Sequence, residues 1–286
     1  MKTSINNEAH WHELRKNRIG ASECAALFGQ HEYIDLFSLY HRILSGKVQD
    51  ENDAMWWGKK EESLIAEYAT EKLGMNLSKV TDYYYLEDVN LGASPDYVDQ
   101  DGQFVQIKST TQRYESDNLP MYIESQLQQE MLCTGTKTII CLVKYADRRV
   151  IAYHRDFNEA FCKELIQRAK DFFVMLEARD EPSVTLKSAA LAKQLYLYSE
   201  DKKEIDKRFD EDFALQVSQL KSLRAQSRDL EKQISVLDAS IKQQIEDAEI
   251  VLYGTEGVLT AKTQVENHKA REATTVTKRI IRIKGE

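Results

Sequence analysis

The sequence contains few residues that interrupt helices, and it lacks the marks of several protein classes. Among its 286 residues are 3 prolines, and no stretch approaches the roughly 20 consecutive apolar residues of a membrane-spanning helix. The segment from Met1 to Trp11 is polar and has no apolar core like that of a signal peptide. These absences argue against a membrane partner and lead us to expect a cytoplasmic protein.

The cysteines and histidines form no recognisable site. None of the 4 cysteines pairs at CxxC spacing, so we expect reduced thiols and neither a disulfide framework nor a zinc site. These cysteines are Cys24, Cys133, Cys141 and Cys162. His10 and His12 lie two residues apart without a third ligand at metal-site spacing, which favours ordinary surface or packing roles. The sequence also lacks a Gly-rich phosphate loop and the signatures of serine or cysteine nucleophiles.

Acidic residues outnumber basic ones, 47 to 39. The net charge is −8, which argues against a generally basic protein that coats DNA. It does not exclude an enzyme that holds Mg²⁺ with a local carboxylate cluster and binds DNA through a local basic groove. Hydrophobic residues make up 42% and charged residues 30% of the chain, enough for one large domain or two ordinary ones.

The prolines indicate how the chain is organised. They stand at 95, 120 and 182, and the segment from Ser183 to Tyr253 contains neither proline nor glycine. This change predicts a boundary near Pro182, with an α/β domain over residues 1–182 and a helical region with a basic β tail over residues 183–286. Periodicity predicts helices at Glu61–Leu73, Ile123–Cys133 and Phe157–Glu177, and strands at Asp82–Asp88, Phe104–Lys108 and Thr138–Lys144.

The region after the boundary carries a heptad-like seam. Its apolar positions are Leu220, Leu223, Leu230, Ile234, Leu237 and Ile241, with one polar break at Ser227. The seam fits a helical hairpin packed on the first domain, and it fits a self-association surface equally well. Residues 258–263 and 274–284 resemble short strands, and the basic tail could bind DNA or form a protected edge strand.

The segment from Ala93 to Lys108 carries the clearest chemistry. Strand alternation puts Gln106 and Lys108 on one face, and a hairpin folded at Asp101-Gly102 would bring Asp96 near Gln106. A carboxylate that holds a metal ion and a lysine that stabilises charge suit the hydrolysis of a phosphodiester. Taken alone, the segment fits an ordinary hairpin with a solvated Asp and Lys equally well.

Other motifs, in order along the chain, make the pattern more specific. They are Trp11-His-Glu-Leu-Arg15 with Ile19-Gly-Ala-Ser22, Trp57-Gly-Lys-Lys-Glu-Glu62, Ser94-Pro-Asp96 with Gln106-Ile-Lys108, and Ser125-Gln-Leu-Gln128. Together they resemble the phage lambda exonuclease and YqaJ-like viral recombinase family of PD-(D/E)xK nucleases. The resemblance covers roughly residues 10–180 and, more weakly, the basic tail.

The resemblance implies a fold, an activity and partners. The fold would be a restriction-endonuclease-like α/β core, with a mixed central sheet flanked by helices. The activity would be that of a Mg²⁺-dependent deoxyribonuclease, with Mn²⁺ as a substitute, which digests linear double-stranded DNA from 5′ to 3′ and leaves 3′ single strands for recombination. The partners would be duplex ends, further copies of the chain in a trimer, and a single-strand annealing protein, in a bacterial or phage-infected host cell.

The resemblance also implies roles for single residues. The metal ligands would be Asp96, Gln106, Glu62 and the backbone carbonyl of Ile107. Lys108 would be the catalytic lysine, and Gln128 would orient water, with Gln126 as a second candidate. Arg15 and Ser22 would bind a DNA phosphate, with Ser22 near the start of a helix.

One departure from the family pattern bears on activity. The family usually has Glu where this chain has Gln106, and a neutral amide should bind Mg²⁺ more weakly than a carboxylate. A natural active variant, a weakened nuclease and an engineered substitution are all consistent with this change, and we favour the first. The alternatives to an exonuclease are a restriction-like endonuclease and a DNA-end-binding protein without activity.

Overall fold

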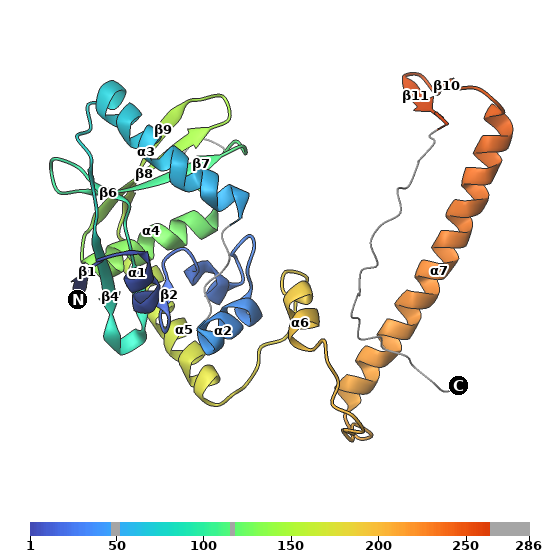
Figure 1. Cartoon of the computed structure of the whole chain (residues 1–286), viewed down its shortest axis with the longest axis horizontal. Helices are drawn as coiled ribbons and strands as arrows, with labels where there is room; N and C mark the ends of the chain where they lie inside the picture. The colour runs from blue at the N-terminus through green and yellow to red at the C-terminus, as the bar shows by residue number, and fades with distance from the viewer. Residues whose placement is uncertain (47–51, 115–117, 264–286) are drawn as a thin grey trace. The chain divides into compact units, whose positions relative to one another are not determined.

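The computed structural model describes residues 1–46, 52–114 and 118–263 (Figure 1). The chain forms two compact units, Met1–Gln194 and Leu195–Glu286. The first unit continues past Pro182, the boundary predicted from composition. It does so because the Ser188 side chain is buried and its hydroxyl, like that of Thr185, donates a hydrogen bond to the carboxylate of Asp35.

A five-stranded mixed sheet forms the centre of the first unit. Its strand order is β3-β6-β7-β8-β9, in which β7 and β8 run parallel and the other neighbours run antiparallel. The strands are β3 (Ser78–Lys79), β6 (Tyr97–Val98), β7 (Phe104–Thr110), β8 (Thr138–Tyr145) and β9 (Val150–Asp156). The predictions of strands at Phe104–Lys108 and Thr138–Lys144 are confirmed.

Helices cover both faces of this sheet (Figure 1). On one face, helix α3 (Asp53–Leu73) packs its buried Ile65, Ala66 and Ala69 against strands β7 and β8. On the other, helix α4 (Met121–Thr134) packs Ile123, Leu127 and Met131 against β8. The predicted α/β architecture, a mixed sheet flanked by helices, is therefore confirmed.

A second, four-stranded sheet adjoins the end of α4. Its order is β1 (Lys2–Ser4), β4 (Asp82–Leu86), β5 (Leu91–Ala93) and β2 (Ile19–Gly20). Gly92 of β5 lies under the buried ring of Tyr83, and a Cβ atom built at Gly92 would overlap the Tyr83 hydroxyl. Glycine at this position of β5 therefore leaves room for the Tyr83 side chain of β4, a few residues before Asp96.

The remaining elements of the first unit pack around a third core cluster. It gathers residues of β2, β5, the 3₁₀ helix η1 (Cys24–Phe28) and helices α2 (Leu36–Ser45) and α5 (Glu159–Glu177). Helix α1 (Glu8–Arg15) and the 3₁₀ helix η2 (Glu87–Val89) complete the unit, and α6 (Ala189–Leu195) ends it. All four cysteines are free and buried.

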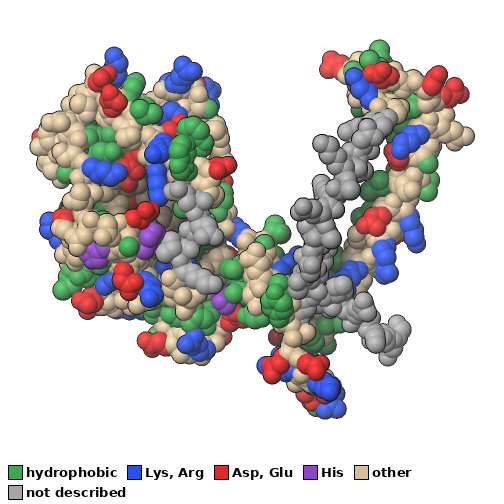
Figure 2. All heavy atoms as spheres, viewed as in Figure 1, with side chains coloured by type: hydrophobic (Ala, Val, Ile, Leu, Met, Phe, Trp, Pro, Cys, Tyr) green, Lys and Arg blue, Asp and Glu red, His purple; other side chains and the backbone are tan. Residues whose placement is uncertain are grey.

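The second unit is built on one long helix. Helix α7 (Glu211–Ile245) contains the predicted seam, and a hairpin of β10 (Ile250–Tyr253) and β11 (Gly257–Thr260) follows it. No residue of α7 is buried in the described structure, and Figure 2 shows hydrophobic side chains at its surface among charged ones. The predicted strand at 274–284 and most of the basic tail lie outside the described residues.

Candidate active site

The predicted hairpin forms and brings Asp96 to strand β7. Strands β6 and β7 pair antiparallel, with Tyr97 opposite Val105, and Gly102 takes a left-handed φ of 80° in the turn between them. Beyond the last paired residues, the backbone N–H of Ile107 donates a 2.8 Å hydrogen bond to the Asp96 carboxylate. The prediction that Asp96 lies beside the Gln106-Ile-Lys108 segment is therefore confirmed.

The same hydrogen bond locates the Ile107 carbonyl. In a β-strand, the N–H and C=O of one residue point toward the same neighbouring strand. The Ile107 N–H points at Asp96, so its carbonyl oxygen faces the same edge of β7. Val105 and Ile107 pack their side chains with α3, so strand alternation directs Gln106 and Lys108 toward the face covered by α4.

The carboxyl group of Asp96 is held in a crowded, acidic environment. Burial, followed by the charge of Glu62, raises the pKa of the half-buried Asp96 to about 7, while Lys108 and the Ile107 N–H act in the opposite direction. Glu62 comes from α3, where its carboxylate accepts a 2.9 Å hydrogen bond from Lys79. The charges of Glu62 and Lys108 thus both act on the Asp96 carboxyl group, and the roles that the resemblance implies for these residues stay predictions.

A third acid, which the sequence analysis did not select, enters from α4. Glu130 is 1% exposed, and its Oε1 accepts a 2.7 Å hydrogen bond from the Gln126 side chain. Burial, followed by the charge of Asp96, raises the pKa of Glu130 to about 8, whereas Gln126 and Lys108 act in the opposite direction. Gln126 and Glu130 are four residues apart and therefore share one face of the helix, a spacing that could have identified the pair.

The neighbouring glutamines of α4 take part in packing. The Gln128 amide donates to the Asp156 carbonyl at 2.9 Å and accepts from the Asn158 N–H at 2.8 Å, so it joins α4 to the start of α5. Gln129 donates to the carbonyls of Ile19 and Gly92. Residues two apart on a helix face nearly opposite ways, so Gln126 and Gln128 serve different surfaces, and Gln126 is the one beside the acidic residues.

Two buried oxygen atoms at this site have no hydrogen-bond partner. They are Oε1 of Gln106 and Oε2 of Glu130, in side chains that are 4% and 1% exposed. A buried oxygen without a partner is costly, and a hard cation that prefers oxygen ligands would satisfy both. Within the described ranges no cluster of three or more His, Cys, Asp or Glu is placed to hold a metal. Since Gln106 and a backbone carbonyl supply oxygens beside Asp96, the residues present still fit Mg²⁺.

Arg15, one of the two predicted phosphate-binding residues, is linked to the Asp96 hairpin through Trp11 and Ser94. The Arg15 guanidinium stacks 4.3 Å from the Trp11 ring and lies 3.7 Å from Glu23, and the Trp11 indole donates a 2.9 Å hydrogen bond to Ser94. Ser22 is exposed, but the element after it is a short 3₁₀ helix that begins at Cys24. The helix expected near Ser22 is therefore a 3₁₀ helix of five residues that begins two residues later, at Cys24.

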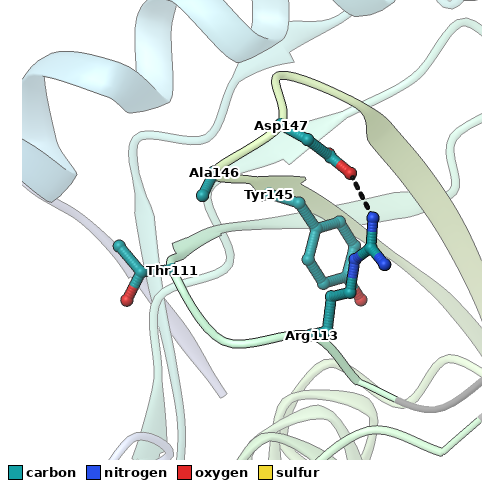
Figure 3. Close-up of a pocket in the computed structure, with 5 residues that line it drawn as sticks. All are labelled: Thr111, Arg113, Tyr145, Ala146 and Asp147. Atoms are coloured by element: carbon teal, nitrogen blue, oxygen red, sulfur yellow. Dashed lines mark hydrogen bonds and ion pairs between the residues drawn. The ribbon is translucent and has the colours of Figure 1, made fainter. Parts of the chain in front are cut away.

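An open pocket of about 340 Å³ lies at the ends of β7 and β8 (Figure 3). It is lined by Thr111, Arg113, Tyr145, Ala146 and Asp147. Arg113 donates a hydrogen bond to Asp147 at 3.2 Å, as the dashed line marks. None of the predicted site residues lines it, and Thr111 directly follows β7, three residues after Lys108.

Comparisons with known proteins add an independent finding. Residues 10–137 match the model of the YqaJ-like viral recombinase domain. An alkaline exonuclease from Laribacter hongkongensis resembles the chain with 20% identity and a TM-score of 0.48, over 66% of this chain and 100% of that one. A phage-related exonuclease from Haemophilus somnus 129PT resembles it with 10% identity and a TM-score of 0.42, over 59% and 99%. No curated protein matches the chain.

A membrane-crossing helix is not found in the part of the chain that the structure describes.

Proposed function

Because residues 10–137 carry a YqaJ-like viral recombinase domain, we propose that the chain is a metal-dependent DNA exonuclease. It digests linear double-stranded DNA from 5′ to 3′ and leaves 3′ single strands for homologous recombination. The observation that carries the proposal is the position of Asp96, which accepts a hydrogen bond from Ile107 N–H beside two buried, unpartnered oxygens. Its partners are duplex ends, further copies of the chain and a single-strand annealing protein.

The metal ion is Mg²⁺, for which Mn²⁺ substitutes. Asp96, the Ile107 carbonyl and the Gln106 amide oxygen would hold it, with Glu62 nearby on α3. When bound, Mg²⁺ polarises a phosphate and the attacking water.

The protein's own groups prepare this site. The Ile107 N–H fixes the orientation of the Asp96 carboxylate, and Gln126 fixes that of Glu130. Lys108 is the cation whose charge acts on both carboxyl groups, and it would stabilise negative charge on a phosphate bound between them. Arg15, whose guanidinium lies over the Trp11 ring, would bind a terminal phosphate with its forked N–H groups.

The experiment that tests the proposal uses three DNA substrates. Purified protein is incubated with end-labelled linear duplex carrying a 5′-phosphate, the same duplex with a 5′-hydroxyl, and closed circular duplex, each with and without Mg²⁺. The proposal predicts Mg²⁺-dependent release of nucleotides from linear DNA alone. Cleavage of the circle would identify an endonuclease, and binding without cleavage would identify a DNA-end-binding protein.

A further inference from the structure

We infer that Glu130 supplies the second carboxylate of the proposed metal site, in the role that Gln106 leaves open. This inference rests on the proposed function of the same site. The starting observation is chemical. The chain has a neutral amide, Gln106, at the position on β7 where the family pattern has a carboxylate to accompany Asp96. One acid and one amide bind Mg²⁺ less tightly than two acids.

The geometry brings Glu130 to the face where Gln106 lies. Gln106 lies directly opposite Cys141 in the parallel pairing of β7 and β8, and Cys141 belongs to the core that α4 covers. Glu130 is on α4, its charge acts on Cys141, and the charge of Asp96 acts on Glu130. The carboxylate therefore reaches the same face of the sheet from the helix above it.

The bonding of Glu130 leaves one oxygen available. The Gln126 side chain donates a hydrogen bond to Oε1 of Glu130. Oε2 of Glu130 is buried and has no hydrogen-bond partner, and the same is true of Oε1 of Gln106. A carboxyl group buried to this degree costs free energy when it is ionised, unless it is paired with positive charge or coordinates a metal; otherwise it takes up a proton. In the described structure, Glu130 takes part in no ion pair with a Lys, Arg or His side chain. A cation bound between Glu130 and Asp96 would stabilise the ionised form of both acids.

A carboxylate exchange tests this inference. The variants are Glu130→Gln, Gln106→Glu, the double variant that carries both, and Glu124→Gln as a control on the same helix, where Glu124 pairs with Arg155. Calorimetric titration of each full-length protein with Mg²⁺ and Mn²⁺, without DNA, measures affinity apart from catalysis. Circular dichroism confirms that each variant is folded.

The expected pattern is reciprocal. Glu130→Gln should weaken metal binding by about 10- to 100-fold, and Gln106→Glu should restore it in that background more than it improves the wild type. Glu124→Gln should bind like the wild type. Unchanged affinity in folded Glu130→Gln would overturn the inference, as would a Gln106→Glu effect that is the same in both backgrounds. Asp96→Asn separates the two levels: if it too binds metal normally, the proposed metal site itself is wrong.

A separate observation concerns helix α7. We propose that α7 pairs in parallel with α7 of a second copy of this chain, as a two-stranded coiled coil. Its seam has Leu220, Ile234 and Ile241 at heptad a positions, and Leu223, Leu230 and Leu237 at d positions. A β-branched residue at a with Leu at d favours two parallel strands, and a single polar a residue, here Ser227, sets the register.

The flanking positions fit the same pairing. In a parallel pair, each g residue meets the e residue five positions later on the partner. These pairs are Gln219 with Arg224, Gln226 with Glu231, and Gln233 with Asp238. No like charges meet. If the two helices instead paired antiparallel with their seams fully overlapping, Glu231 of one copy would lie against Glu231 of the other.

Disulfide trapping tests this proposal. All four native cysteines are buried, so an added cysteine on α7 reports on α7 alone. Ser227→Cys places a thiol at an a position, where a parallel pair brings it against its own copy, while Ser222→Cys places one on the outer face. Mild oxidation of the full chain should crosslink Ser227→Cys and not Ser222→Cys. Equal crosslinking at both positions, or none at Ser227→Cys, would overturn the proposal, including the case in which another part of the chain covers the seam.

Discussion

The carboxyl groups of Asp96 and Glu130 hold their protons to a higher pH than solvated acids do. Their pKa values rise from 3.8 to about 7 and from 4.5 to about 8, chiefly through burial and then through neighbouring charge, that of Glu62 for Asp96 and that of Asp96 for Glu130. The folded chain therefore binds more protons than the unfolded chain between about pH 4 and pH 8. By linkage, their contribution to stability is fully present at low pH and is lost as pH rises through this window.

This gives a prediction for the metal-free protein. Its free energy of unfolding, measured by urea titration in a chelator, should include a component that falls from pH 5 to pH 8. Asp96→Asn and Glu130→Gln should each reduce that slope, and added Mg²⁺ should oppose it at pH 8, because the metal replaces the protons. A slope that is identical in wild type and both variants would show that neither acid titrates abnormally.

Sequence reasoning identified the residues of the hairpin but not their partner on α4. The order of Asp96, Gln106 and Lys108 was sufficient because strand alternation and a tight turn are local rules. Glu130 required knowledge of which face of α4 meets the sheet, and that depends on packing between distant segments. Whether Gln126 or Gln128 lies at the site also depends on which face of α4 meets the sheet. The hydrogen bonds of Gln128 place its amide at Asp156 and Asn158.

At the scale of elements, helix α1 carries Arg15, which we propose as the residue that recognises a DNA end. The guanidinium lies between the Trp11 ring and Glu23, and the absence of a side chain at Gly20 leaves room for it. Arg15→Ala should slow digestion of 5′-phosphorylated duplex more than that of 5′-hydroxyl duplex, because only the former offers the phosphate. Lys16→Ala, one residue on, serves as the control. An equal loss on both substrates would indicate a structural or general DNA-binding role.

Long elements could be predicted and short ones could not. The helix predicted at Ile123–Cys133 is observed at Met121–Thr134, just after Pro120, and that at Glu61–Leu73 begins earlier, where Asn52 caps α3. Strands β1, β2, β3 and β6 span two or three residues, too few for any periodicity to be detected. Their pairing is decided by contacts with the longer strands.

For the whole molecule, the extent of the first unit determines which truncation keeps activity. A chain ending at Gln194 retains the hydrogen bonds from Thr185 and Ser188 to Asp35, and it should keep Mg²⁺-dependent cleavage with altered assembly. A chain ending at Val184 loses these bonds and leaves Asp35 buried, which should cost roughly 1–3 kcal/mol of stability. Thermal unfolding of both chains checks the difference. A folded 1–194 chain without cleavage would mean that the second unit completes the active site.

The central claim is that Asp96 anchors a metal-dependent nuclease site, and one assay tests it most directly. Release of labelled nucleotides from linear 5′-phosphorylated duplex is measured in Mg²⁺ for the wild type and for Asp96→Ala, with circular dichroism of both. Loss of a ligand that supports polarisation worth several kcal/mol should lower the rate by roughly 100-fold or more while the fold is kept. A folded Asp96→Ala protein that cleaves as fast as the wild type would contradict the claim.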